Sequence, residues 1–336
     1  MLVPLLCALP YLAAPPPASA QSTTCSSNAT NLAFGQLAGS GPVDTTGTVS
    51  VTCQTTGLQL LTTVSVRMCL NIGVGTASTA VAPFRQMRNA PGDLLQFQIY
   101  RDPARTQIWG STTNTQIPEP ERIDLRYQIL LGTGASATAQ RTMYGRIPAQ
   151  AGLAAGSYES GFGAGHTRLD YRYTESLALL PVWPASCTTG GSGGGSLIRF
   201  PFTATATVPN RCSITSASSL DFGTVPGLID ANRDRNSTIT LSCTRRTPWQ
   251  IALDNGRNAS GSARALRLGT SGNLVRYELY RDAARTQRWG AALNVDTLPG
   301  TGTGGSQAVT VYGRVPAGQV VPAGPYADVI TVTVTY

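Results

Sequence analysis

The sequence predicts an all-β protein built from two tandem β-sandwich domains. Gly and Pro are abundant (36 and 22 residues) and only 12% of residues are charged, a composition that favours many turns and short strands. Several segments alternate apolar and polar residues, which is the pattern of a strand with one buried face and one wet face. Long segments also occur twice in the same order, so the chain consists of two diverged copies of one domain.

Residues 1–20 are predicted to be a secretory signal peptide, because an apolar core precedes the sequence Ala-Ser-Ala at 18–20. This run is too short and too rich in proline to span a bilayer as a helix. The mature chain is therefore expected to be exported through the periplasm. Its net charge of +8 comes entirely from arginine and is spread over both copies. That distribution indicates a genome that favours arginine codons, and no nucleic-acid partner is expected.

Six cysteines remain after the signal peptide, and an even number in an oxidising compartment favours disulfides. A metal site is the alternative, but the chain has no Cys-x-x-Cys pair and only one histidine. The first pair in each copy has a similar spacing, 28 residues in one and 31 in the other. The predicted disulfides are Cys25–Cys53, Cys212–Cys243 and Cys69–Cys187.

The repeat aligns the two copies along most of their length. NLAFGQL (31–37) matches SLDFGTV (219–225), and MYGRIPAQAGLAAGSYES (143–160) matches VYGRVPAGQVVPAGPYAD (311–328). Thr and Val alternate cleanly in ITVTVTY (330–336), which predicts a half-buried final strand. The predicted divisions are a first domain at 21–175, a loop or linker at 176–199 and a second domain at 200–336.

A charged segment is also repeated, since FQIYRDPARTQIWG (97–110) and YELYRDAARTQRWG (277–290) share nine of fourteen residues. Arg281, Asp282 and Arg285 could form a site in the second copy. The segment has no nucleophile–base pair, however, and Arg–Asp contacts across a turn beside a tryptophan are an ordinary structural device. The favoured interpretation is architecture.

Three segments of the second copy carry a family resemblance: YRDAARTQRWG (280–290), the C-terminal VYGRVPAGQVVPAGPYADVITVTVTY (311–336) and FTATATVPNRCSIT with LDFGTV (202–225). They resemble the spore coat protein U domain, a family similar to the subunits of archaic chaperone–usher pili. The resemblance implies two immunoglobulin-like β-sandwiches, the C-terminal one lacking a strand. A periplasmic chaperone supplies that strand first, and the N-terminal extension of an adjacent pilus subunit then replaces it at the outer-membrane usher. An interface with these partners is expected on the final strand, at Ile330, Val332, Val334 and Tyr336.

Only residues 21–24 lie between the predicted cleavage site and Cys25, and four residues span at most about 14 Å. They are too short to serve as a donor strand. The resemblance therefore implies a subunit at the end of a fibre, which is a two-domain tip adhesin on the cell surface. Its expected roles are attachment to an abiotic or host surface and biofilm formation.

The segment LALLPVWP (177–184) has no counterpart in the second copy. One hypothesis makes it an exposed adhesive loop, and the alternative is packing in the core or between the domains. GGSGGGS (190–196), which follows it, is typical of a flexible linker or loop tip. The predicted adhesive residues are Leu177, Leu179, Leu180, Val182 and Trp183.

Enzymatic signatures are absent from the sequence. His166, the one histidine, lies in a glycine-rich turn, and there is no G-x-S-x-G, P-loop or H-E-x-x-H motif. GTGTGG (300–305) indicates a hairpin loop rather than a phosphate site. No enzyme activity, cofactor or metal is expected. The alternative function is a soluble secreted or coat-associated binding protein made of two complete β-sandwiches.

Overall fold

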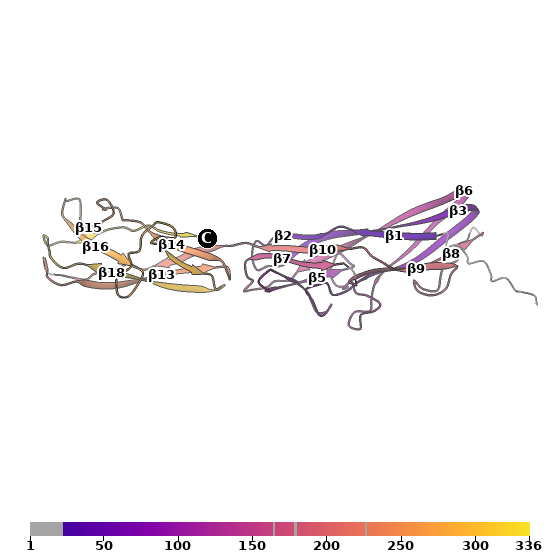
Figure 1. The fold of residues 1–336 in the computed structure, drawn as a ribbon, viewed down its shortest axis with the longest axis horizontal. Helices are drawn as coiled ribbons and strands as arrows, with labels where there is room; N and C mark the ends of the chain where they lie inside the picture. The colour runs from indigo at the N-terminus through magenta and orange to yellow at the C-terminus, as the bar shows by residue number, and fades with distance from the viewer. Residues whose placement is uncertain (1–22, 164, 178–179, 226) are drawn as a thin grey trace, which may run out of the picture.

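The computed structural model describes residues 23–163, 165–177, 180–225 and 227–336, so the predicted signal peptide lies outside it. Two all-β domains lie end to end and give an elongated molecule (Figure 1). The predicted all-β class with two sandwich domains is confirmed. Within the described ranges, no helix is long and apolar enough to cross a membrane.

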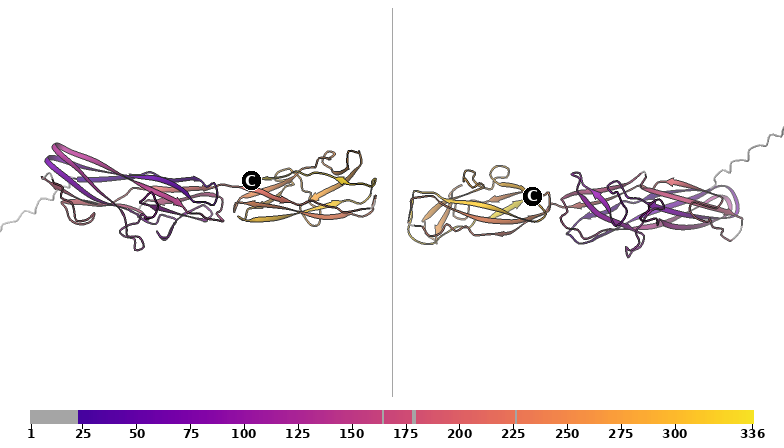
Figure 2. Two further views of the ribbon diagram at one scale, coloured as in Figure 1. Left: turned by 180° about the vertical axis from the view of Figure 1, so that it is seen from behind. Right: turned by 90° about the horizontal axis from the view of Figure 1, so that it is seen from below.

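The first domain is built from strands β1 to β10. Their bounds are β1 (Thr23–Ala29), β2 (Leu32–Gln36), β3 (Val43–Ile72), β4 (Arg85–Arg88), β5 (Leu94–Tyr100), β6 (Glu121–Ile147), β7 (Gly156–Phe162), β8 (Thr167–Ser176), β9 (Gly193–Ile198) and β10 (Phe202–Val208). The sheet order is β2-β10-β7-β4-β5-β6-β3-β8-β9, and β1 pairs with β3. The long strands β3 and β6 bend together and continue from one layer of the sandwich into the other (Figure 2).

The second domain repeats most of this order. Its strands are β11 (Cys212–Ala217), β12 (Leu228–Ile229), β13 (Arg233–Cys243), β14 (Pro248–Leu253), β15 (Arg264–Leu268), β16 (Leu274–Tyr280), β17 (Leu298–Thr301), β18 (Ser306–Val315), β19 (Gln319–Val320), β20 (Tyr326–Ala327) and β21 (Val332–Thr335). The sheet β11-β13-β18-β16-β15-β20 matches β1-β3-β6-β5-β4-β7 strand for strand. Beyond β7 the first domain continues with β10 and β2, whereas β20 is the last strand of its sheet among the described residues.

Strand β10 corrects the predicted domain boundary. It runs antiparallel to β7 and parallel to β2, so it lies inside the first domain (Figure 1). Its inward side chains Phe202, Ala204, Ala206 and Val208 are all buried in the core of that domain. The assignment of 200–208 to the second domain is therefore wrong. Alternation along this segment predicts a strand, but it does not identify the sheet that the strand joins.

The glycine-rich run after Cys187 is also not a linker. Residues 193–198 form β9, which pairs with β8. A Cβ on Gly193 would lie 2.4 Å from the hydroxyl of Tyr173, and one on Gly195 would lie 2.6 Å from the ring of Tyr171. Glycine is needed here because the backbone of β9 lies directly on these two buried rings. The predicted loop or linker at 176–199 is thus partly a strand of the first domain.

The repeated charged segment is a turn that the two domains build in the same way. Asp102 accepts bonds from the backbone of Thr106 and Gln107, and Asp282 does so from Thr286 and Gln287. The following tryptophans, Trp109 and Trp289, are fully buried and donate their indole N–H to a carbonyl of the facing layer. These contacts agree with the architectural interpretation.

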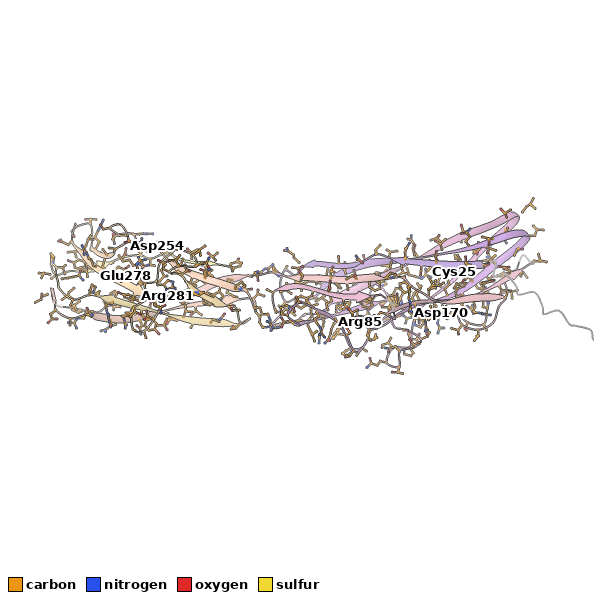
Figure 3. The ribbon with its side chains drawn as sticks, viewed as in Figure 1. Cys25, Arg85, Asp170, Asp254, Glu278 and Arg281 are labelled. Atoms are coloured by element: carbon orange, nitrogen blue, oxygen red, sulfur yellow. A yellow bond between two sulfur atoms is a disulfide. The ribbon has the colours of Figure 1, made fainter. Side chains whose placement is uncertain are left out.

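Each domain also buries one arginine at the start of an equivalent strand. Figure 3 labels Arg85 of the first domain and Glu278, the partner of the second arginine. Arg264 pairs with Glu278, whose second oxygen accepts from Arg288 at 2.9 Å. Arg85 has Gln98 in place of that glutamate and donates to three backbone carbonyls. Burial without a carboxylate lowers the pKa of Arg85 to about 9.

The joint between the domains is short and is held by ion pairs between side chains. Only residues 209–211 separate β10 from β11. Asp93 of the first domain meets Arg245 at 2.9 Å and Arg246 at 2.7 Å, and its side chain is only 7% exposed. The backbone at Ala154 also forms a parallel bridge with Arg245. The bend at 244–247 therefore docks the second domain onto the first.

Candidate functional site

An unfilled strand position in the second domain is the first candidate site. The two copies share one register at this edge, because Arg88 lies opposite Glu159 in the first and Arg267 lies opposite Ala327 in the second. Strand β10 covers this edge in the first domain. In the second domain no described strand does, and two adjoining pockets open there. We call them together the open groove.

Apolar side chains line the open groove along its length. Leu220, Phe222 and Leu266 line both pockets, so the groove is continuous. In the first domain the counterparts of Leu220 and Phe222 are Leu32 and Phe34, and Leu32 is completely buried beneath β10. Further apolar lining residues include Ile229, Ile239, Leu253, Val275, Leu279, Val311, Val315, Val321, Ile330 and Val332.

The segment 219–225 shows what the missing strand does to its neighbours. Its counterpart in the first domain forms strand β2, whose ladder partner is β10. Residues 220–224 take no regular structure, although they match β2 in sequence. A strand forms only when its backbone groups find partners, so this stretch has the sequence of a strand without its ladder.

The four residues predicted on the final strand lie in three different environments. Ile330 and Val332 line the open groove. Val334 lies further along β21 opposite Ile251 and packs on the core of the second domain. Tyr336 lies at the joint between the domains and is 54% exposed. Sequence reasoning missed the groove wall at 220–225, 227–229 and 321–326, although the internal repeat points to it.

The second candidate site is an apolar surface at the far end of the first domain. The bends of β3 and β6 and the end of β8 meet there (Figure 1). Register places Leu60 opposite Leu131 and Thr63 opposite Ser176, so three chain segments lie side by side. We call the exposed leucines of these segments and of the loop after β8 the distal patch. Its members are Leu61 (55% exposed), Leu130 (62%), Leu131 (82%), Leu177 (82%) and Leu180 (77%).

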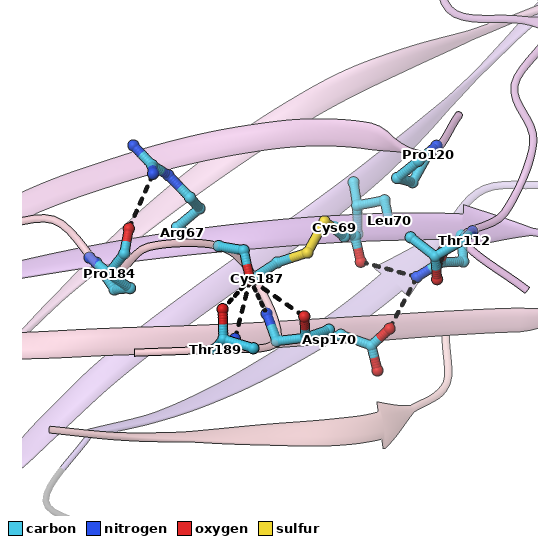
Figure 4. Close-up of a disulfide and its surroundings, with 12 residues drawn as sticks. Arg67, Cys69, Leu70, Thr112, Pro120, Asp170, Pro184, Cys187 and Thr189 are labelled. Carbon is cyan, nitrogen blue, oxygen red and sulfur yellow. Dashed lines mark hydrogen bonds between the residues drawn. A yellow bond between two sulfur atoms is a disulfide. The ribbon is translucent and has the colours of Figure 1, made fainter. Parts of the chain in front are cut away.

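The loop that carries Leu177 and Leu180 is fastened to β3. Its base is tied by the disulfide between Cys69 and Cys187 (Figure 4). Arg67 donates to the carbonyl of Pro184 at 2.8 Å, and its guanidinium lies 5.7 Å from the ring centre of Trp183. All three predicted disulfides are confirmed.

The predicted adhesive residues occupy different environments. Leu177, Leu180 and Val182 are exposed, whereas Trp183 is half-buried against Arg67. Leu179 lies outside the described residues. Three members of the distal patch were missed, Leu61, Leu130 and Leu131. The paired leucines at 60–61 and 130–131 were the available signal in the sequence.

The remaining chemistry is limited. His166 accepts a hydrogen bond at Nδ1 from the backbone N–H of Gly75 and lies in a turn. Among the described residues, no three His, Cys, Asp or Glu side chains are grouped to hold a metal ion.

Comparisons with known proteins give a family match. The family model described as Spore Coat Protein U domain matches residues 14–164 and 198–333. Protein U of Myxococcus xanthus is 33% identical over 145 residues, which is 39% of this chain and 80% of that protein. Two similar solved structures cover more of the chain at lower identity. One is the CsuC–CsuE chaperone–tip adhesion subunit pre-assembly complex from archaic chaperone-usher Csu pili of Acinetobacter baumannii, with a TM-score of 0.45 at 16% identity over 93% of this chain and 100% of that one. The other is the CupB6 tip adhesin from Pseudomonas aeruginosa, with a TM-score of 0.35 at 12% identity over 93% of this chain and 95% of that one.

Proposed function

The chain belongs to the Spore Coat Protein U domain family, and from this premise we propose that it is a two-domain pilus tip subunit that attaches to surfaces. The observation that carries the proposal is the difference between the two copies of one fold. Strand β10 completes the first domain from within the chain, whereas the second domain keeps an open groove at the same position. One filled and one open acceptor suit a protein that joins a fibre through its second domain.

Strand addition explains why an open groove is tolerated. A long apolar groove in water promotes aggregation, since every Å² left uncovered forgoes roughly 25 cal/mol. A periplasmic chaperone would cover the groove first, and the N-terminal segment of the adjacent subunit would replace it at the outer-membrane usher. Strand β10 is the template for the final arrangement, antiparallel to β20 and parallel to 219–225.

The assembly step is tested by Val332→Asp, because Val332 lines the groove. An unpaired charge on this apolar wall costs several kcal/mol when a strand covers it. We expect the chaperone to be lost on co-purification while the first domain keeps its fold. Thr333→Asp on the exposed face of the same strand is the matched control and should retain the chaperone.

Two outcomes would contradict the assembly role. One is normal chaperone co-purification of Val332→Asp. The other is a chain that purifies alone as a stable monomer with slow hydrogen exchange along 219–225, which would favour the soluble, coat-associated alternative.

The distal patch is the proposed adhesive surface. Its bends correspond to the 244–247 bend of the second domain, which rests on the neighbouring domain. In the first domain the same end carries exposed leucines instead. Each leucine buried against a surface contributes about 1.5–3 kcal/mol, and many pili per cell would multiply the effect. This arrangement supports the proposed roles in surface attachment and biofilm formation.

The adhesive role is tested by changing Leu131, Leu177 and Leu180 together to Ser. These side chains are 77–82% exposed, so the fold and pilus assembly should be unchanged while attachment to an apolar surface falls. Val295→Ser, at a position 73% exposed on the second domain, is the control. Unchanged attachment of the triple variant, with normal pili, would refute this role.

A further inference from the structure

The open groove differs chemically from its filled counterpart at one level. Register makes Asp328 the counterpart of Ser160, and the aligned strands make Tyr277 the counterpart of Phe97. In the first domain Ser160 lies opposite Ala204 of β10, and the side chains of Phe97, Ser160 and Ala204 are all buried. The open groove therefore has a carboxylate and a phenol where the filled one has a small hydroxyl and a plain ring.

The carboxylate of Asp328 is held firmly in place. The hydroxyl of Tyr277 donates to Oδ2 at 2.8 Å. Asn258 donates to Oδ1 from its backbone at 3.2 Å and from its side chain at 3.1 Å. Gly256 passes so close that a Cβ there would lie 2.0 Å from Oδ2. An aspartate offers about four acceptor positions, so these three bonds leave one free on Oδ2, and Asp328 lines the groove.

Covering the groove would remove the remaining water from Asp328. A carboxylate that loses water without gaining a hydrogen bond destabilises the complex, whereas one that gains a donor stabilises it. In the first domain the residue at this level of the inserted strand is Ala204, which lies opposite Leu32 of β2 as well as Ser160 of β7. Space at this level is therefore small, and a long aliphatic side chain would clash.

We propose that Asp328, oriented by Tyr277, selects the strand that fills the open groove. The strand is the N-terminal segment of another pilus subunit, so this inference rests on the proposed function. At the position facing Asp328 the strand carries a small side chain with a hydrogen-bond donor, namely Ser, Thr or Asn. Its neighbours two residues away on either side are apolar, as Phe202 and Ala206 are in β10.

A peptide series tests this selection on the unaltered full chain. The peptide has the sequence of residues 199–209 with a fluorescent label, and position 204 is Ala, Ser, Thr or Leu. We expect the Ser and Thr peptides to bind about tenfold more tightly than the Ala peptide by fluorescence anisotropy, because a hydrogen bond to a charged group is gained. The Leu peptide should bind most weakly.

Variants of the protein supply the second half of the cycle. Asp328→Ser restores the residue of the first domain, and the preference for Ser over Ala should disappear. Tyr277→Phe tests the same pair without touching the carboxylate and should reduce the preference. Val332→Asp should abolish binding of every peptide, which places the binding in the groove.

The outcomes distinguish selection by Asp328 from strand addition to the groove. Equal affinity of the Ala and Ser peptides for the unaltered chain, or the same ratio in Asp328→Ser, would overturn the selection by Asp328 while leaving strand addition intact. Failure of all four peptides to bind the unaltered chain would overturn both the acceptor role of the groove and the selection.

Discussion

Removing the side chain of Phe202 should destabilise the first domain and not the second. Phe202 is 4% exposed, and its ring stacks on that of Phe162 with centroids 4.5 Å apart and planes 4° from parallel. Truncating a buried phenylalanine to alanine removes its burial and leaves a cavity, which costs about 3–5 kcal/mol. In a domain of this size each kcal/mol lowers the midpoint by roughly 2–4 °C, so Phe202→Ala should lower it by about 6–20 °C.

Hydrogen exchange read by mass spectrometry assigns the loss to a domain. Peptides from β7 and β2 should lose protection, because these strands pair with β10. Peptides from β13 and β18 should keep theirs. Thr205→Ser, on the outward face of the same strand, is the control and should leave the midpoint within about 1 °C. Loss of protection confined to the second domain would refute the assignment of β10 to the first.

Two further predictions concern the glycine-rich strand and the joint. Gly195→Val should lower the unfolding free energy of the first domain by about 1–3 kcal/mol, because its Cβ would lie 2.6 Å from the ring of Tyr171. Ser196→Val, at the exposed neighbouring position, is the control and should leave this free energy unchanged. Equal effects of the two variants on urea unfolding would contradict this packing. Asp93→Asn should loosen the joint at pH 7 and broaden the interdomain distance measured between two fluorescent labels. A hydrogen bond from Asn89 and the ion pairs with two arginines of the second domain lower the pKa of Asp93 below its usual 3.8. The unaltered joint should therefore hold above pH 3.8 and loosen only as the pH falls further. An unaltered joint that opens at pH 5 would contradict this.

The sequence predicted the features that depend on local spacing. Cys25 and Cys53 lie opposite each other on neighbouring strands, as Cys212 and Cys243 do, so matched spacing in two copies was enough to pair them. The all-β class and the two-domain division followed from alternation and repetition. These signals are carried by residues close in sequence or by the repeat itself.

The predictions that failed concern features that depend on which distant segments of the chain come together. The alternation of 202–208 is the same whether the strand fills its own domain or its neighbour, because the period of a strand gives the face and not the partner. The glycines of 193–195 have the composition of a linker, and only the rings of Tyr171 and Tyr173 make them a strand. Leu61 and Leu131 come from segments about seventy residues apart that the paired bends of β3 and β6 bring together.

The same ends of one fold have different surroundings in the two copies, and this links the open groove to the distal patch. In the second domain the 244–247 bend docks on the first domain, and the opposite end of that fold holds the open groove. In the first domain β10 already fills the equivalent groove, so its free surface is the bend end with its exposed leucines. A pair of self-sufficient domains would have no need for either feature, since an uncovered groove and a bare cluster of leucines both lower solubility. Their presence at opposite ends of an elongated chain is the arrangement expected of a subunit that joins a fibre at one end and meets a surface at the other.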